Sequence, residues 1–334
     1  MTLSEYIKRY KFNYIQSILK TNHQWHWSAL SVNSNIIWDI IQANTDKKLE
    51  WYGISRNKNI TWDIIQANPD KPWNWQGISE NSNITWDIIQ ANPDKPWDWS
   101  YLSRNSNITW NIIEANLKKP LNWYYISRNK NITWDIIQAN QDKSWTAWDW
   151  SGISCHKNIT WDIIKANIDK PWTAWKWTFI SYNSNITWDI IKANSKNSWT
   201  SWNWQYMSKN PNITWDIIKN NLDKNLDWYS LSSHKNITWD IIKANIDKPW
   251  KWDYISYNPN ITWEIIKNNL DKPWYWHGLS SNPNIFEIDL SKTIREYFAK
   301  KTIVSHWRIA ISNPEYTICK KRLQREFENM IIIN

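Results

Sequence analysis

The chain has 334 residues, among them 33 Trp, 15 Tyr and only 4 Gly, and its formal net charge is +9. Residues 1–34, 35–283 and 284–334 share that charge almost equally, so the sequence indicates no concentrated basic face of the kind that binds nucleic-acid phosphates. Cys155 and Cys319 lie too far apart for a metal motif or a disulfide framework. The N-terminus lacks the apolar segment of a secretory signal, and no apolar run approaches the roughly 20 residues of a membrane span. We therefore expect an intracellular, non-secreted protein in a reducing environment that does not enter membranes.

Residues 1–34 precede a repetitive region and are predicted to form a helical cap. They contain the apolar pairs Tyr14-Ile15 and Ile18-Leu19, followed by Trp25-His26-Trp27, which resembles half of a repeat unit. A repeat array has an apolar face at each end, and atypical terminal units normally cover it. We expect residues 1–34 to cover the first face.

Residues 35–283 repeat one sequence unit ten times. Seven copies have 24 residues and three have 27, and the cleanest copy, residues 83–106, reads N-I-T-W-D-I-I-Q-A-N-P-D-K-P-W-D-W-S-Y-L-S-R-N-S. A unit this short cannot bury a core of its own, so neighbouring copies must stack on one another. The repeat predicts one elongated solenoid.

The first half of each copy is predicted to be a short helix, as in copy two, which starts at Asn59. Thr61 suits an N-cap, and Asp63 places a carboxylate at the positive end of the helix. Ile60 and Ile65 have the spacing of a hydrophobic staple. Asn68 is predicted to end the helix in the left-handed conformation, which Asn tolerates.

The second half of each copy is predicted to be another short helix. In copy two we expect it to begin at Pro72, because Pro favours the first helical position. Trp73, Trp75 and Ile78 supply its apolar contacts, and a polar turn leads into copy three. The fold class is therefore predicted to be all-α, an α-solenoid of two-helix repeats.

The three longer copies bear on this choice of helix. Each gains three residues that include an additional Trp: residues 145–147, 172–174 and 199–201. Three residues keep the new Trp near the same helical face, whereas they would reverse every following side chain of a strand. The alternative is a β/α solenoid like that of leucine-rich repeats, which would need an L-x-x-L-x-L alternation that the unit lacks.

Residues 284–334 are predicted to form a C-terminal helical cap. The repeat fades into an apolar stretch from Leu290 to Ile303, and Asn313-Pro314-Glu315 suggests the start of a further helix. That helix would carry Lys320, Lys321, Arg322 and Arg325, so a partner-binding tail is a second interpretation.

Comparison of the ten copies separates constant positions from variable ones. The constant Asn positions could form a polar binding ladder, but satisfying turn backbone groups is the simpler interpretation, and His156 and His234 could imitate such an Asn. The Asp position is read as helix-end charge rather than as a catalytic group. The Trp positions are read as core, because Leu replaces Trp at Leu49, Leu121 and Leu226.

Two variable positions are candidates for partner binding. All four glycines share one position of the second helix, which the other copies fill with Tyr101, Tyr125, Phe179, Tyr206, Ser230 and Tyr254; a tight core resists such variation, so we expect a partly exposed position. The second position follows the Ile pair and carries Lys only in the last five copies, where we expect a basic stripe of Lys165, Lys192, Lys219, Lys243 and Lys267.

The repeat N-I-T-W-D-I-I-x-A-N-P-D-K-P-W-x-W resembles the Trp-rich tandem-repeat proteins of giant DNA viruses of amoebae, the mimivirus relatives. The ending W-R-x-A-I-S-N-P-E-Y-T-I-C-K-K-R-L-Q-R-E-F is similar to theirs, and the resemblance covers nearly the whole chain. Copy one departs from the pattern at Ile37, and copy seven at Asn197-Ser198. The resemblance implies a viral protein in an infected host cell, in its cytoplasm or in the virion. It implies no enzymatic activity and no functional residues.

The sequence contains no Gly-rich phosphate loop, no metal motif and no nucleophile motif. We therefore expect a non-catalytic scaffold without a cofactor, metal site or small-molecule substrate, which binds a protein partner. One alternative is single-stranded nucleic-acid binding through the Lys stripe and exposed Trp. Another is a purely structural virion component.

Overall fold

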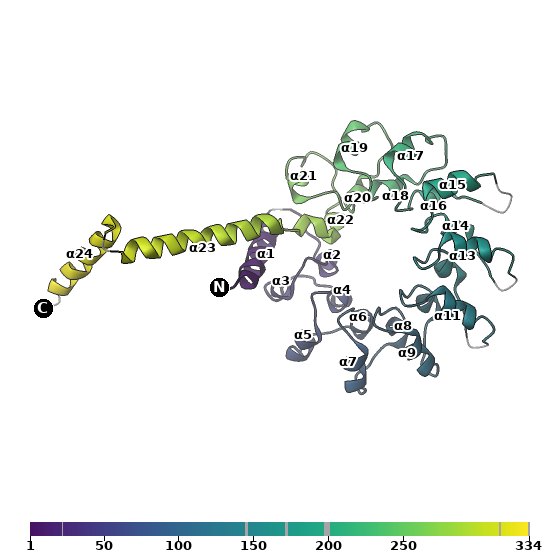
Figure 1. The fold of residues 1–334 in the computed structure, drawn as a ribbon, viewed down its shortest axis with the longest axis horizontal. Coiled ribbons are helices and arrows are strands. Elements are labelled where there is room, and N and C mark those ends of the chain that lie inside the picture. Colours follow the sequence, from purple (N-terminus) through teal and green to yellow (C-terminus); the bar gives the residue numbers. More distant parts are fainter. Residues whose placement is uncertain (22, 144–145, 171–172, 197–200, 314, 333–334) are drawn as a thin grey trace. The chain divides into compact units, whose positions relative to one another are not determined.

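The computed structural model describes the chain except for residues 22, 144–145, 171–172, 197–200, 314 and 333–334 (Figure 1). Every regular element in the described residues is a helix, so the all-α prediction is confirmed and the β/α alternative has no strand to support it. The chain divides into two compact units. One contains residues 22–286, and the other contains residues 1–21 and 287–334.

The first helices of the repeat begin at the constant Trp, as predicted. Thr61 caps α5 (Trp62–Ala67) by accepting a hydrogen bond from the Ile64 amide at 3.4 Å. Asn68 does not adopt the left-handed conformation; its side-chain amide instead donates to the Ile64 carbonyl at 2.8 Å, which satisfies the helix end. The other first helices are α3 (Trp38–Gln42), α7 (Trp86–Ala91), α9 (Trp110–Ala115), α11 (Trp134–Ala139), α13 (Trp161–Ala166), α15 (Trp188–Asn194), α17 (Trp215–Lys219), α19 (Trp239–Ala244) and α21 (Trp263–Lys267).

The second helices begin later than predicted. In copy two the helix α6 (Trp75–Glu80) starts three residues after Pro72, because Asn74 is the N-cap and accepts from the Gly77 amide at 3.0 Å. Trp73 lies in the preceding segment, where its indole N–H donates to the Asn68 carbonyl at 2.8 Å. The other second helices are α2 (Trp27–Ser31), α4 (Trp51–Arg56), α8 (Trp99–Leu102), α10 (Trp123–Ile126), α12 (Trp150–Ser154), α14 (Trp177–Ile180), α16 (Trp204–Met207), α18 (Trp228–Ser232), α20 (Trp252–Ile255) and α22 (Trp276–Ser281).

The three-residue insertions lengthen the segment between the two helices of a copy. Thr146 lies in this segment and donates to the Asn140 carbonyl at 3.1 Å, and Thr173 makes the corresponding bond in copy six at 2.9 Å. The inserted Trp145, Trp172 and Trp199 lie outside the described residues. The described inserted residues are not helical, so the insertions do not test helical periodicity. Contrary to the expectation from the sequence, they do not favour helix over strand, although the helical fold itself is confirmed.

Buried amides join each copy to the one before it. The Asn81 side chain donates to the carbonyls of Ser55, Asn57 and Ile60, at 2.9, 3.1 and 3.0 Å. A hydroxyl adds to these bonds, because Ser55 accepts from the Asn74 amide at 2.9 Å. The equivalent side chains, which we call the buried ladder, are Asn33, Asn57, Asn81, Asn105, Asn129, His156, Asn183, Asn210, His234, Asn258 and Asn282.

The constant opening Asn of each copy has the same structural role. The Asn59 side chain donates to the carbonyls of Ser34 and Ile36, at 2.9 and 3.0 Å. The interpretation of the constant Asn positions as backbone partners is thus confirmed. The sequence did not reveal that the opening Asn binds the preceding copy, whereas the Asn of the Asn68 position binds its own helix.

Tryptophan rings fill the joints between copies. Trp97 of copy three packs on Trp62 and Trp75 of copy two, with ring centroids 5.7 and 5.2 Å apart. The same pattern recurs when Trp250 packs on Trp215 and Trp228. Because the rings pack on one another and on buried Ile, they form the core of the array, as predicted.

The array of repeats closes on itself, which the sequence did not predict. Residues 23–34 dock against copy ten as an additional copy would: Trp25 packs on Trp263 and Trp276, with centroids 5.9 and 5.1 Å apart. The His26 amide donates to the Ser280 hydroxyl at 3.0 Å. Asn33 donates to the carbonyls of Ser280 and Asn282, at 2.8 and 3.1 Å. These are the bonds that join consecutive copies, so the expected pair of free array ends is absent from this unit.

The copy at this seam is divided between two distant parts of the chain. Its second half is residues 23–34, and its first half is the 3₁₀ turn Pro283–Phe286, where Asn284-Ile285 repeats the opening of a copy. Phe286 is fully buried and its ring lies 5.3 Å from that of Trp25. In Figure 1 the labelled second helices of this unit form an inner circle and the first helices an outer one. Residues 23–34 and 283–286 thus belong to the repeat array.

The second unit contains the remaining helices, α1 (Leu3–Leu19), α23 (Leu290–Ser312) and α24 (Thr317–Ile332). Tyr6 of α1 packs on Tyr297 of α23 with centroids 5.3 Å apart, and Lys300 donates to the Tyr6 hydroxyl at 2.9 Å. On α24, Lys320, Lys321 and Arg325 are exposed. Among the helices that the structure describes, none combines the length and the apolar character that crossing a bilayer requires.

Candidate functional site

The glycine position lies on the second helix, two residues after the helix begins. Where it carries a ring, the side chain is half-buried in Tyr101, Tyr125, Phe179 and Tyr206, and Tyr254 is exposed. This placement agrees with the expectation of a partly exposed position. Ser230 occupies the same place on α18.

Close contact with the preceding second helix explains why some copies carry Gly at this position. A Cβ atom on Gly77 would lie 2.6 Å from the Tyr52 carbonyl oxygen and 3.3 Å from the Arg56 amide nitrogen, both in the backbone of the preceding second helix. At Gly152 the nearest atoms instead belong to the flexible Arg128 side chain, at 2.7 Å. The position therefore also controls how closely neighbouring second helices approach, which the comparison of copies did not indicate.

Tyrosines at neighbouring positions extend the predicted set into groups of packed rings. Tyr52 lies 6.1 Å from Tyr101, which lies 6.0 Å from Tyr125. Phe179 and Tyr182 each pack on Tyr206. We call the set the second-helix aromatic band: Tyr52, Tyr101, Tyr124, Tyr125, Phe179, Tyr182, Tyr206, Tyr229, Tyr254, Tyr257 and Tyr275.

Six members of the band were missed from the sequence. Tyr52, Tyr124 and Tyr229 come one residue before the glycine position, and Tyr182 and Tyr257 come three residues after it. Tyr275 is the N-cap residue of α22. Since residues three apart share a helical face, the spacing around the glycine position was the signal that would have found Tyr182 and Tyr257.

A group of neighbouring exposed rings of the band spans copies eight to ten, and Tyr124 of copy four is 54% exposed as well. Tyr229, Tyr254, Tyr257 and Tyr275 are 49%, 40%, 38% and 44% exposed. Tyr254 lies 5.1 Å from Tyr229 and 6.4 Å from Tyr257, which in turn lies 6.3 Å from Tyr275. We call these four residues the exposed tyrosine patch.

Cations cover several rings of the band. The Arg128 guanidinium lies 3.7 Å from the centroid of Tyr124, and the Lys251 ammonium lies 4.9 Å from that of Tyr229. Arg128 also pairs with Asp149. Burial acts to raise the pKa of Asp149, but the hydrogen bond and charge of Arg128 outweigh it and hold that pKa below its ordinary value.

At the end of the band that contains Tyr52, one carboxylate, that of Glu80, binds several neighbouring groups. Glu80 pairs with Arg104 at 3.1 Å and Arg56 at 3.6 Å and accepts from the Tyr52 hydroxyl at 2.9 Å. Burial, together with this hydrogen bond to Glu80, raises the pKa of Tyr52 to about 12. Arg56, Arg104 and Arg128 thus have carboxylate partners nearby, and the band around them is aromatic rather than basic in character.

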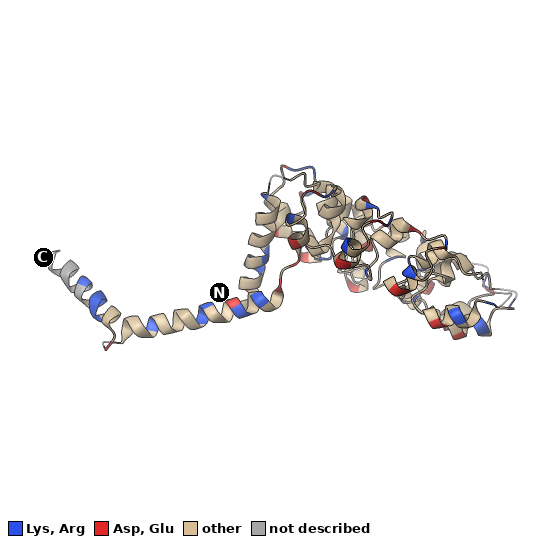
Figure 2. Ribbon diagram, turned by 90° about the horizontal axis from the view of Figure 1, so that it is seen from above, with Lys and Arg blue, Asp and Glu red and all other residues tan. Residues whose placement is uncertain are grey.

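The predicted Lys stripe lies on the first helices. Each Lys pairs with the acid three residues earlier: Lys165 with Asp162, Lys192 with Asp189, Lys219 with Asp216, Lys243 with Asp240 and Lys267 with Glu264, at 3.0, 2.8, 2.7, 2.8 and 2.6 Å. Figure 2 shows basic and acidic segments side by side in the repeats. The stripe is therefore a row of exposed ion pairs and not a basic surface.

The Trp residues that the nucleic-acid alternative needs are packed. Within the described repeats the Trp rings are buried or half-buried, and Trp307 of α23, in the other unit, is 54% exposed. Base stacking needs a free ring face, and several of these rings stack face to face on one another, namely Trp38 on Trp73, Trp110 on Trp148 and Trp134 on Trp175.

The described residues contain no group of three or more His, Cys, Asp or Glu side chains placed to hold a metal ion. The class of protein that these observations define is a closed array of two-helix repeats with an aromatic band on its second helices. Comparisons with protein-family models, curated proteins and solved structures found no match.

Proposed function

We propose that the chain is a non-catalytic scaffold that binds a protein partner through the second-helix aromatic band. The observation that carries the proposal is the exposed tyrosine patch, in which four neighbouring rings are 38–49% exposed, whereas the Trp rings of the described repeats are buried or half-buried. Tyr supplies a large apolar area with a polar end and few rotatable bonds, and is enriched among residues that dominate protein interfaces.

The variation between copies supports the same surface. The joints use constant Trp, Ile, Ser and Asn, whereas the band lies at positions that change from copy to copy. A ring of near-identical copies can present a distinct surface to one partner only where its copies differ. Because Arg56, Arg104 and Arg128 of the band pair with carboxylates, a partner would gain more from aromatic packing than from net charge.

The test compares partner capture by the wild-type chain and by a patch variant, Tyr229→Ser with Tyr254→Ser and Tyr275→Ser. The matched control carries Lys219→Gln and Lys243→Gln on the exposed first helices. All three chains are used to capture proteins from infected amoebae, and the captured proteins are quantified. We expect one partner to bind the wild-type and control chains but not the patch variant.

Titration of that purified partner completes the test. Losing three interface tyrosines should weaken its affinity at least tenfold, since a truncated hot-spot residue costs about 2 kcal/mol. Equal capture by the wild-type and patch chains would contradict the proposal. Binding that disappears after nuclease treatment and falls steeply with salt would instead support the nucleic-acid alternative.

The resemblance of the repeat to giant-virus proteins supports the remaining part of the proposal, a viral protein acting inside the infected host cell. Quantification in purified virions and in host cytoplasm tests it. Abundance confined to virions would favour the structural-component alternative over a scaffold with a host or viral partner.

A further inference from the structure

The same pocket occurs at two joints of the repeat array. One pocket of about 450 Å³ lies between copies two and three, and another of about 430 Å³ lies between copies seven and eight. Eight lining positions correspond. Trp62, Trp73 and Trp75 line the first pocket where Trp188, Trp202 and Trp204 line the second. The pocket is therefore a feature of the repeat and not an accident of one joint.

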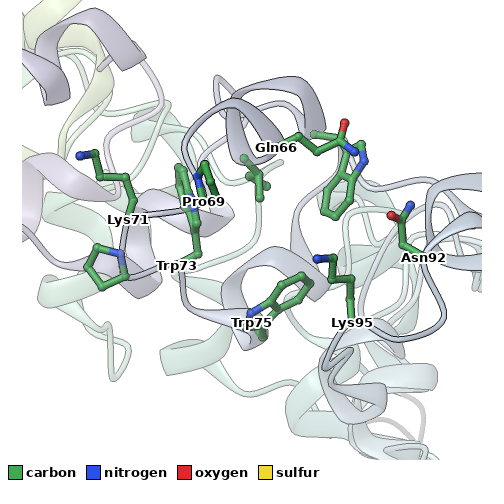
Figure 3. A pocket seen from close by; sticks show the side chains of 10 residues that line it. Gln66, Pro69, Lys71, Trp73, Trp75, Asn92 and Lys95 are labelled. Atoms are coloured by element: carbon green, nitrogen blue, oxygen red, sulfur yellow. The ribbon is translucent and has the colours of Figure 1, made fainter.

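The two pockets share a polar side made of an amide and an ammonium group. Asn92 and Lys95 of copy three correspond to Asn221 and Lys224 of copy eight. Figure 3 shows Gln66, Asn92 and Lys95 around one side of the first pocket, with Trp73 beside Pro69 on the other side. Neither pocket is lined by an Asp or Glu side chain. Indoles beside ammonium groups suit a planar ligand that carries negative charge.

Each pocket is lined by two Lys side chains, Lys71 and Lys95 in the first and Lys192 and Lys224 in the second. In the first pocket Lys71 lies on the side away from Lys95 (Figure 3), whereas Lys192 stands where Gln66 stands in the first pocket, beside the Asn and Lys of the next copy. The ion pairs of Lys192 and Lys224 with Asp189 and Asp223, at 2.8 Å each, involve highly exposed carboxylates. Exposed pairs of this kind are weak, so a bound anion can replace or join them.

We propose that the pocket between copies seven and eight binds a small aromatic anion. The ring of the ligand packs on Trp188 and Trp204, whose own rings lie 5.9 Å apart, and its carboxylate or phosphate contacts the ammonium groups of Lys192 and Lys224. The variable Lys position thereby has a role that the ion pairs alone do not explain. The proposal is independent of the aromatic band, since none of these residues belongs to it.

The test is calorimetric titration of the full chain with indole-3-acetate and with phenyl phosphate, with indole and acetate as controls for the ring and for the anion. The variant Lys192→Gln with Lys224→Gln removes the cations of this pocket. Gln66→Lys, a substitution at an exposed position, gives the first pocket a Lys where the second pocket has Lys192. The matched control is Lys301→Gln on α23, which lies outside the repeats.

We expect an aromatic anion to bind at least fivefold more tightly than indole or acetate. The double variant should lose one tight site, Gln66→Lys should gain one, and Lys301→Gln should match the wild type. Tighter binding of phenyl phosphate than of indole-3-acetate would identify phosphate as the anion. Binding of indole as tight as that of both anions, or an unchanged number of sites in both pocket variants, would overturn the proposal.

Discussion

At the scale of single residues, the buried ladder shows why His can replace Asn. The His156 Nε2 lies 3.1 Å from the Asn129 carbonyl, and its Nδ1 accepts from the Asn158 amide at 3.1 Å. Asn81 makes the same two kinds of bond with its amide nitrogen and oxygen. The substitution was predicted from the sequence because both side chains offer one donor and one acceptor. The reach into the preceding copy was not predicted, because a single sequence does not show which copy a buried amide faces.

This geometry predicts acid sensitivity. A second proton would turn Nδ1 of His156 and of His234 into a donor facing a backbone amide, and burial already holds the pKa of both rings below their ordinary 6.5. Since the unfolded state binds these protons more readily, stability is full above about pH 6.5 and falls as the pH drops below it.

Chemical unfolding at about pH 7 and pH 5 measures this effect. The variant His156→Asn with His234→Asn should lose less stability on acidification than the wild type. The exposed His306 lies in the other unit, and His306→Asn is the control. An identical acid response of wild type and double variant would refute the role of the two rings.

At the scale of elements, the two helices of a copy differed in how well the sequence predicted them. The first helix has a constant Trp and, in every copy but the first, a Thr cap, so its start was correct. The second helix is capped by a residue that varies among copies, for example Asn74, Asp98 and Glu50, while Lys176 makes no side-chain cap bond. Pro72 drew the prediction to an earlier residue. The residue before the second helix is held instead by the preceding copy, since the Asn74 amide donates to the Ser55 hydroxyl at 2.9 Å, a bond that no single copy encodes.

The approach of neighbouring second helices leads to a prediction about glycine. Gly77→Ala should destabilise the chain by about 1–3 kcal/mol, because the new methyl meets the backbone of α4 and one helix must move. Gly152→Ala should be nearly neutral, since the Arg128 side chain can rotate away and Ala is the better helix former by about 1 kcal/mol. Urea unfolding measures both, and a larger loss for Gly152→Ala would be inconsistent with this account.

At the scale of the whole array, the stacking of copies was predictable and the closure of the array was not. A 24-residue unit forces stacking, but closure depends on a small rotation added at every joint, which no single copy encodes. The sequence still contained a signal, since Trp25-His26-Trp27 matches the second half of a copy and Asn284-Ile285 matches the opening of the first half. They were interpreted as caps because each half was considered separately.

The seam has no covalent link, which makes it the joint that opens first. Trp25→Ala removes the ring that packs on Trp263, Trp276 and Phe286, so we expect a slower-sedimenting, more extended chain with unchanged helix content. Trp274→Ala removes the equivalent ring of a joint whose copies are consecutive in the chain, and the high effective concentration should keep that joint closed. Sedimentation velocity with circular dichroism distinguishes them. Two variants that both sediment like the wild type would show that the Trp25 contacts do not hold the seam.

Closure of the array also changes the order in which its copies should unfold. An open repeat protein frays, because each terminal copy has one neighbour and its amide hydrogens exchange soonest. The bonds from His26, Asn33 and Asn35 to residues 280–283 give the first and last copies a second neighbour. Hydrogen exchange should therefore show no gradient from the ends of the array to its middle. Unfolding should instead require one concerted rupture at the seam before any copy can detach.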